Sequence, residues 1–487
     1  MTRYFGNKIV PALANVTTFS LLCRNNSVFQ KKCNAMKYRL FFVFLLVLPM
    51  LFSAGATAQS VVVSNLGLKD TAIVRPFGEE YALTYSDNAF VLCNGHDHTA
   101  LAFNVPFIVR DVEIWNDETA YFCGEYGGRG VMGCFDILPT FAGSAPVNYA
   151  VTMFSATNPG LINCTTDVTG IKRLALFWDA QRNSVALAMV CDEVLKGPEW
   201  NRTAVMGAYF SPAGIWPTSV LYNKDGLKVY HDIETLKDLV VATMTDTNIE
   251  GCYTRAFKNT NYNFPAYPCI THSSDRILLN TPMGPPQITR LKENSAAVVQ
   301  YNDKPGMMVH FLDFNTTTGH PTAAYPSSQN DISLPPYHYN TGMWWFNGVR
   351  YLEDTLYVLG SMNYPGETGF EKWLFEMPNT GIATNALMHR FTNSEPYSMD
   401  VDRMTQRPVS AGKFMRDNNL DWDVYVPQIP SGCQERLGIN VTRQQPSIVT
   451  DGADGDEVFV NQNNIQFFPI ISVINLQKVC PNNLIQE

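Results

Sequence analysis

One eight-residue pattern occurs twice in the chain and constrains the fold more than any other feature. Residues 117–124, DETAYFCG, match residues 353–360, EDTLYVLG. Between and beyond them, weaker copies of the same turn-then-strand pattern begin at Arg182, Lys237, Glu293 and Gln406. Short antiparallel strands that repeat about every 50–60 residues are typical of a β-propeller. In that fold, sheets that cannot bury both faces alone stack around a channel.

The clearest unit is residues 107–138, whose alternating apolar residues predict strands at 107–115, 119–124 and 130–137. A further, earlier turn is predicted at Asp87-Asn88. Helical periodicity is scarce throughout, so the pattern indicates an all-β protein.

We expect a β-propeller of six or seven blades, in which residues 59–487 form one domain. Seven turn-then-strand units can be recognised, and the first of them, residues 81–104, is short. The C-terminal segment 430–487 contains a strand-like stretch at 457–477. We expect that stretch to close the ring by pairing with the N-terminal strand Val61–Ser64. A two-sheet sandwich followed by a second β domain is the alternative.

Residues 36–58 have the pattern of a secretory signal peptide. Two basic residues precede an apolar run from Phe41 to Phe52, and an A-x-A cleavage pattern follows at 56–58. The run is shorter than the roughly 20 residues that span a bilayer, so we expect no transmembrane segment after cleavage. Met36 is then the expected start, with 1–35 a misassigned upstream segment. The mature chain is expected in the periplasm, at the cell surface or outside the cell.

The charge of the mature chain excludes several partners. Seven of the 35 basic residues and none of the 44 acidic residues lie in the leader, so residues 59–487 carry a net charge of −16. Such a surface repels nucleic acids and anionic membranes. We therefore expect neither nucleic-acid binding nor membrane attachment through a basic patch.

Nine cysteines follow the leader. An export signal permits disulfides, and Cys123 and Cys134 flank a glycine-rich turn across which they could form one. Because nine is odd, at least one thiol stays free or pairs with another chain. No C-x-x-C motif occurs, so neither a zinc ribbon nor a thioredoxin-type redox site is supported.

Aromatic residues between 335 and 346 form the candidate ligand surface. Aromatic rings beside polar groups suit sugar or peptide binding, and the residues in question are Tyr337, His338, Tyr339, Trp344 and Trp345. In a strand, adjacent tryptophans point to opposite faces, so one of Trp344 and Trp345 is expected in the core.

An acidic stretch at 451–457 is the candidate metal site. Four carboxylates interspersed with glycines suit Ca²⁺, and they belong to Asp451, Asp454, Asp456 and Glu457. The spacing is not that of an EF-hand, so a solvated acidic loop is the competing interpretation. No other cofactor is expected.

The stretch VRDVEIWNDETAYFCG within residues 107–138, together with the leader at 36–60, resembles uncharacterised exported β-propeller-like proteins of the Bacteroidetes. The resemblance implies the fold and the compartment, and it implies no known activity.

The sequence indicates a binding protein more than an enzyme. Motifs for serine nucleophiles, zinc proteases, dinucleotides and phosphate loops are absent from it. We expect recognition of a glycan, a peptide or a cell-surface protein through one propeller face. A carbohydrate-active hydrolase or lyase with carboxylates in the central channel is the first alternative. Asp111, Glu113 and Glu125 are candidates for such carboxylates, and positions at strand edges and turns explain them equally well. A structural member of a cell-envelope complex is the second.

Overall fold

The computed structural model describes strands, their tight turns and one helix within residues 59–479. The described residues are 59–63, 73–78, 81–94, 99–143, 146–155, 166–179, 183–191, 194–196, 204–211, 214–222, 228–237, 239–246, 252–258, 269–273, 286–302, 306–317, 328–333, 343–363, 370–378, 385–392, 394–402, 407–416, 419–426, 435–444, 447–451, 456–458, 461–464, 470–475 and 477–479. They belong to the unit Ala58–Glu487, one of two into which the chain divides. Nearly all of them lie in strands, and among them no helix has the length and apolar character to cross a membrane.

Two sheets consist of four strands that follow closely in the chain plus one strand from the C-terminal region. The first has the order β9 (Ile171–Asp179), β10 (Ser184–Cys191), β12 (Ala204–Ser211), β13 (Gly214–Tyr222) and β31 (Asp456–Val458). The second has the order β14 (Lys228–Thr235), β15 (Leu239–Asp246), β16 (Cys252–Lys258), β17 (Cys269–Ser273) and β30 (Ser447–Asp451). All their neighbouring strands are antiparallel.

Two larger sheets each join two such sets of strands through a shared strand. One contains β2 (Ile73–Phe77), β3 (Tyr81–Asn94), β4 (Thr99–Trp115), β5 (Thr119–Tyr126), β6 (Arg129–Asp136), β7 (Val147–Ser155) and β32 (Asn461–Asn464), with β33 (Ile470–Asn475) on β4. The other contains β18 (Gln287–Lys292), β19 (Ser295–Asn302), β20 (Gly306–Asp313), β21 (Ser328–Ser333), β29 (Glu435–Gln444), β25 (Asn385–Thr392), β24 (Phe370–Pro378), β23 (Thr355–Asn363) and β22 (Met343–Leu352). The shared strands are β4 and β29.

A further sheet combines both ends of the unit. Its order is β26 (Ser394–Asp402), β27 (Arg407–Arg416), β28 (Asn419–Val426), β1 (Gln59–Val63) and β34 (Gln477–Val479). A small pair, β8 (Thr166–Val168) with β11 (Val194–Lys196), and the short helix α3 (Ile137–Ala142) complete the described elements.

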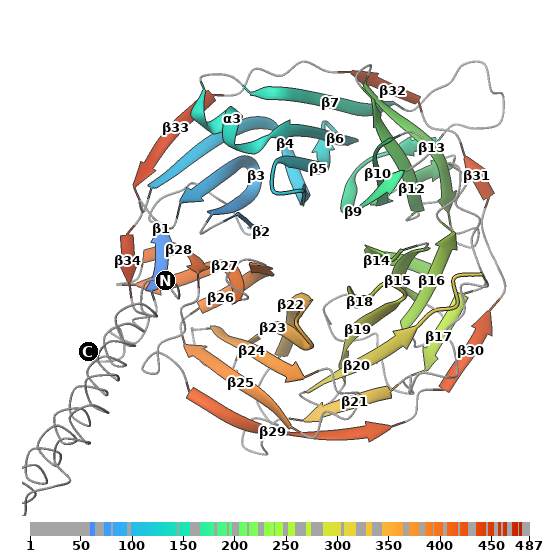
Figure 1. Cartoon of the computed structure of the whole chain (residues 1–487), viewed down its shortest axis with the longest axis vertical. Coiled ribbons are helices and arrows are strands. Elements are labelled where there is room, and N and C mark those ends of the chain that lie inside the picture. The colour runs from blue at the N-terminus through green and yellow to red at the C-terminus, as the bar shows by residue number, and fades with distance from the viewer. Residues whose placement is uncertain are drawn as a thin grey trace, which may run out of the picture. The chain divides into compact units, whose positions relative to one another are not determined.

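Seven strands contact one another in a closed cycle. β2 contacts β4, and contacts then follow between β4 and β9, β9 and β14, β14 and β18, β18 and β22, β22 and β26, and β26 and β2. Figure 1 shows these strands nearest the centre of the unit, with their sheets extending outward. This arrangement of antiparallel sheets around a common axis is propeller-like.

Six C-terminal strands run around the outside of the unit. In chain order, β29 pairs with β21 and β25, β30 with β17, β31 with β13, β32 with β7, β33 with β4, and β34 with β1. They appear in orange-red along the perimeter of Figure 1. We call β29–β34 the C-terminal belt. The belt supplies backbone hydrogen bonds to outer strands that would otherwise be exposed edges.

The repeated eight-residue pattern is confirmed as a turn followed by a strand. Asn116 and Asp117 have φ values of 52° and 58° before β5, and Glu353 and Asp354 have 46° and 60° before β23. Asn and Asp tolerate this left-handed region better than most residues. The strands predicted from 184, 239 and 295 are also present, namely β10, β15 and β19. Of the turn predicted at 406–407, Arg407 is already the first residue of β27, and Gln406 lies outside the described residues.

Two sequence expectations need correction in detail. Asp87-Asn88 is no turn between strands, because it lies inside β3 at a register shift between Asp87 and Ala89. The expected pairing of 457–477 with Val61–Ser64 is met only at its end: β34 pairs with β1, with Gln477 opposite Val62 and Val479 opposite Ser60. The preceding C-terminal strands β31, β32 and β33 pair with β13, β7 and β4.

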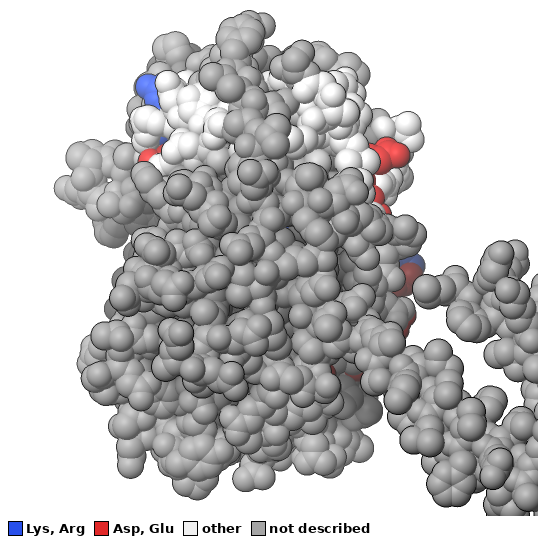
Figure 2. All heavy atoms as spheres, turned by 90° about the vertical axis from the view of Figure 1, so that its left-hand side faces the viewer, with Lys and Arg blue, Asp and Glu red and all other residues white. Residues whose placement is uncertain are grey.

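The core lies between the faces of neighbouring sheets. The largest described cluster centres on Phe90, Phe103, Phe122 and Phe135, all fully buried and with ring centroids 5.0–6.2 Å apart. A second cluster joins β5 to β9 and β10 through Tyr121, Leu174 and Leu187, among others. On the side turned toward the viewer in Figure 2, the described surface is mostly uncharged, and charged side chains are visible only toward its edges.

Cys123 and Cys134, the candidate disulfide pair, are free thiols in the structure. The hairpin register places Cys123 opposite Met132 and Cys134 opposite Tyr121, so the two cysteines are not directly opposite each other. Their sulfurs lie instead 3.6 Å from the Ile171 carbonyl oxygen and 3.7 Å from the Asn148 carbonyl oxygen.

Candidate functional site

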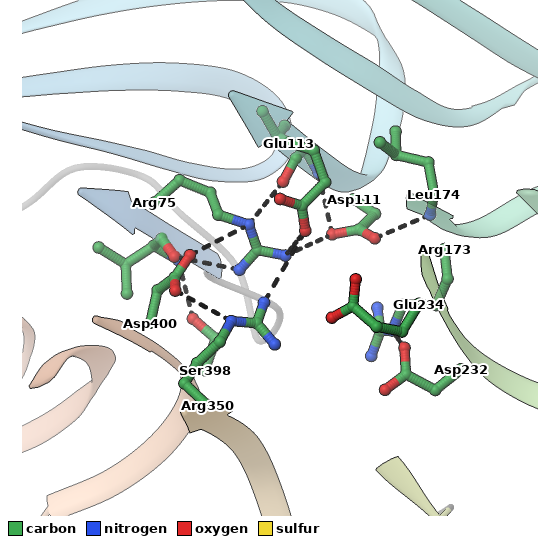
Figure 3. A network of polar contacts seen from close by, with 12 residues as sticks. Arg75, Asp111, Glu113, Arg173, Leu174, Asp232, Glu234, Arg350, Ser398 and Asp400 are labelled. Carbon is green, nitrogen blue, oxygen red and sulfur yellow. Dashed lines mark hydrogen bonds and ion pairs between the residues drawn. The ribbon is translucent and has the colours of Figure 1, made fainter. Parts of the chain in front are cut away.

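The central strands carry a network of charged side chains, which we call the channel network (Figure 3). Its members come from β2, β4, β9, β14, β22 and β26. They are Arg75, Asp111, Glu113, Arg173, Asp232, Glu234, Arg350 and Asp400. The network therefore joins the first inner strand of the unit, β2, to the last, β26.

Arg75 on β2 is the hub of this network. Its guanidinium is buried, and Nη2 donates to Asp111 Oδ1 and Glu113 Oε1, both at 3.0 Å. Nε donates to the Val112 carbonyl oxygen at 2.6 Å and lies 3.6 Å from Asp400 Oδ2. Burial lowers the pKa of Arg75, but the surrounding carboxylates outweigh that effect and raise it overall. Arg75 therefore stays charged and holds β2, β4 and β26 together.

Arg350 on β22 extends the network. Its Nε donates to Asp400 Oδ1 at 2.9 Å, and its Nη2 lies 3.8 Å from Glu113 Oε1. Glu113 thus stands between two guanidinium groups. Desolvation by burial nevertheless raises the pKa of Glu113 to about 7, against the lowering effects of Arg75 and Arg350.

Several network carboxylates also bind the backbone of the next sheet. Leu174 N–H on β9 donates to Asp111 Oδ2 at 3.0 Å, and Ile288 N–H on β18 donates to Asp232 Oδ2 at 2.9 Å. Arg290 N–H donates to Glu234 Oε2 at 3.2 Å. The innermost strand of a sheet is an edge whose N–H groups need acceptors, and these carboxylates supply them.

Irregularities in strand pairing determine where two of the acidic side chains point. The register shifts between Val109 and Asp111 on β4, and between Tyr230 and Asp232 on β14. Asp111, Asp232 and Asp400 each accept a hydrogen bond from the N–H of the following β-branched residue, at 2.7–3.0 Å. A bulge re-aims one side chain in this way. Asp111 and Glu113 were among the carboxylate candidates of the sequence analysis. An Asp followed by Val or Ile, shortly before a turn, is the sequence signal that could have added Asp232 and Asp400.

Burial also shapes the protonation of the neighbouring groups. It raises the pKa of Asp232 and of Glu234, and Arg173, 3.8 Å from Asp232 through Nε, lowers the pKa of Asp232 in opposition. Burial, together with Lys172 and Arg173, lowers the pKa of His231 to about 4. His231 is therefore neutral at physiological pH, and its Nε2 lies 2.7 Å from Thr245 Oγ1.

An aromatic pair lies at the ends of two network strands. Trp115 ends β4, shortly after Glu113, and Trp178 lies next to the last residue of β9. Their rings stack with centroids 6.2 Å apart and planes 16° apart. Trp178 is 47% exposed, the largest value among the exposed large apolar residues in the described chain. Sequence reasoning did not select this pair.

The sequence-predicted aromatic site lies largely outside the described residues. Tyr337, His338 and Tyr339 are in that part of the chain. Trp344 and Trp345 lie near the start of β22, opposite Met362 and Ser361 of β23, and only their backbone is described. They share β22 with Arg350 of the channel network.

The predicted calcium residues are divided between two sheets. Asp451 ends β30 opposite Cys269, whereas Asp456 and Glu457 begin β31 opposite Tyr222 and Leu221. Asp454 is outside the described residues. Within the described part of the chain, no group of three metal-binding side chains is placed to hold a metal ion.

No protein-family profile and no curated protein matches the chain. Two solved structures are similar to it at low sequence identity. The β-propeller domain of Myceliophteria thermophila Cps50 (Swd1) has 11% identity and a TM-score of 0.45, and the match covers 76% of this chain and 100% of that one. The extracellular domain of a putative one-component system from B. thetaiotaomicron has 6% identity and a TM-score of 0.17, over 80% and 83% of the two chains.

Proposed function

We propose that the chain is an exported seven-bladed β-propeller that binds a partner through the face at which β4 and β9 end. The closed cycle of seven inner strands supports this blade count. The pairing of N-terminal β1 with β28 and β34 supports closure by both ends of the chain. The signal-peptide pattern at 36–58 supports export.

The observation that carries the binding function is the exposed Trp178 stacked on Trp115. Exposed aromatic rings held in place by packing are favourable contact points for ligands, because they bury large areas at little entropic cost. The side chains of the channel network, by contrast, are engaged in structural bonds between inner strands. A glycan, a peptide or a surface protein is the proposed partner class.

The test uses Ala58–Glu487 on an array of glycans and peptides, with retention and product formation both measured. We expect retention without cleavage, and a clear loss of retention for Trp178→Ala. The matched control is Tyr126→Ala: Tyr126 is 40% exposed and lies at the opposite end of β5 from the turn after Trp115. Retention that is equal in all three proteins would contradict this binding face.

A carbohydrate-active hydrolase or lyase is the second candidate, and Glu113 favours it. A carboxyl with a pKa of about 7 can act as a general acid near neutral pH. Product formation in the array experiment, abolished by Glu113→Gln, would establish this activity in place of simple binding.

A further inference from the structure

We propose that the exposed face of Trp178 is a platform for a pyranose ring, with the carboxylates of Asp117 and Glu118 as acceptors for sugar hydroxyls. This inference rests on the proposed binding function and names its ligand class as a saccharide. The proposal rests on the stacked pair Trp115 and Trp178 and on the turn residues Asp117 and Glu118 that follow Trp115.

The geometry of the two indoles favours a flat ligand. The two ring planes are only 16° apart and the centroids 6.2 Å apart, so the exposed Trp178 lies beside a second indole of nearly the same orientation. A cage for a compact ammonium group needs rings that meet at steep angles around the cation. The C–H face of a pyranose is flat and apolar, and it matches a single indole face.

The platform is held rigidly before any ligand arrives. Trp115 packs against the buried cluster of Tyr121, Met132 and Leu174 between β5 and β9. The turn that follows is fixed by Asn116 and Asp117 at positive φ and by a 3.1 Å hydrogen bond from Glu118 N–H to the Trp115 carbonyl oxygen. Rigid aromatic contacts lose little entropy on binding.

Two carboxylate side chains lie in the turn that follows Trp115. They belong to Asp117 and Glu118, and both residues are exposed. Ile137 N–H donates to the Glu118 carbonyl oxygen at 2.9 Å, which ties the start of α3 to this turn. The next residue, Leu138, is 45% exposed. Ionised carboxylates accept strong hydrogen bonds from hydroxyl groups, so aromatic stacking and hydroxyl recognition coincide at one place.

A guanidinium group is the competing flat ligand, since arginine also stacks on tryptophan and pairs with carboxylates. The test therefore includes both chemistries. Ala58–Glu487 is titrated with cellohexaose, xylohexaose, maltohexaose and chitohexaose, and with the peptide acetyl-GRGRG-amide. Indole fluorescence and calorimetry report binding, and thermal unfolding reports the integrity of each variant.

We expect at least one hexaose to bind and to change the indole fluorescence. Trp178→Ala is expected to weaken that binding about tenfold, the loss of one stacking contact. The double variant Asp117→Asn/Glu118→Gln is expected to weaken it severalfold, and Tyr126→Ala to leave it unchanged. Trp178→Phe should restore part of the affinity, because a smaller flat ring remains.

Each contrary outcome overturns a distinct claim. Binding of the peptide alone, lost in Trp178→Ala, would overturn the saccharide while leaving the proposed binding function intact. Hexaose binding that is unaffected by Trp178→Ala would overturn the platform. Failure of both probe classes here would overturn the saccharide assignment, and failure of the whole glycan and peptide array would overturn the binding function itself.

Discussion

The inner and outer edges of the sheets are satisfied in different ways. At the inner edge, side chains make the bonds: Arg75 joins three strands, and Asp111 and Asp232 accept N–H groups from the next sheet. At the outer edge, the backbone of the C-terminal belt pairs with one sheet after another. The inner edge is therefore specified by particular residues, and the outer edge by the length and course of one segment.

Because of this difference, the two edges should respond differently to mutation. Backbone pairing tolerates many side chains, so single substitutions in the belt should matter little and its removal should matter greatly. The channel network depends on charged side chains whose partners lie on other inner strands. Removing one charge there leaves another buried and unpaired, which is costly. Four changes to the chain would test this contrast, and the most damaging is removal of the belt.

Deletion of 435–487 should cause the largest loss. It removes all six belt strands and exposes the outer edges of the sheets, which favours aggregation. We expect a protein that is largely insoluble or associated, measured by size-exclusion chromatography with light scattering. Deletion of 480–487, beyond β34, is the control and should behave like the intact chain. A soluble monomer lacking 435–487 with unchanged thermal unfolding would contradict the role of the belt.

Arg75→Met should destabilise the protein by about 3–5 kcal/mol, because it leaves buried carboxylates without their partner. Lys237→Met is the control, since Lys237 forms an ion pair of 2.9 Å with Glu293 at the exposed surface. That substitution should cost less than about 1 kcal/mol. Denaturant unfolding measures both, and equal losses would show that burial does not distinguish the two pairs.

Asp232→Ala should cost about 1–3 kcal/mol, because the N–H groups of Ile233 and Ile288 lose their acceptor. Asp232→Asn keeps one side-chain oxygen and should cost less. The same unfolding measurement compares them. Should Asn prove as harmful as Ala, the charge opposite Arg173 would be the important property, rather than the acceptor between sheets.

Glu113→Gln should change how the stability of the protein depends on pH more than it changes the stability at any one pH. The folded-state pKa of about 7 lies above the ordinary 4.5, so the stability contributed by Glu113 is full below pH 4.5 and is lost as the pH rises through 7. The difference in melting temperature between wild type and Glu113→Gln should therefore vary across this window. A constant difference from pH 4.5 to pH 8 would rule out this titration.

The wild-type curve alone would not isolate Glu113. Burial lowers the pKa of His231 and of His310 to about 4. The stability that these two histidines contribute to the protein is therefore lost as the pH falls below their ordinary pKa of 6.5. Their effect opposes that of Glu113 over part of the same range. Subtracting the variant from the wild type removes the histidines, which both proteins share.

The repeating hairpins could be predicted because their signal is local. Each combines a turn residue that tolerates positive φ, as at Asn116 or Asp354, with an apolar strand after it. The belt could not be predicted in detail, since strands such as Asn461–Asn464 are polar and lack alternation. Their pairing follows from where the preceding sheets leave an open edge, which no short stretch of sequence encodes.

The aromatic pair was missed for a similar reason. Sequence reasoning favoured the aromatic residues at 337–345 because they cluster in one short stretch, whereas Trp115 and Trp178 belong to different repeats of the chain. They meet because each lies near the end of the inner strand of a neighbouring repeat. Aligning the repeats on their turns, Asn116 and Asn183, would have placed both indoles at corresponding ends of adjacent inner strands.

The pairing of β1 also sets an order on folding. Gln59–Val63 is synthesised first, yet its two partners, β28 and β34, are among the last strands to be made. The ring therefore cannot close until nearly the whole chain is present, and such long-range pairing is slow. If the chain is exported leader-first, as proposed, β1 would stay unpaired during its passage. The fold would then be completed in the compartment of arrival, after the last residues have followed.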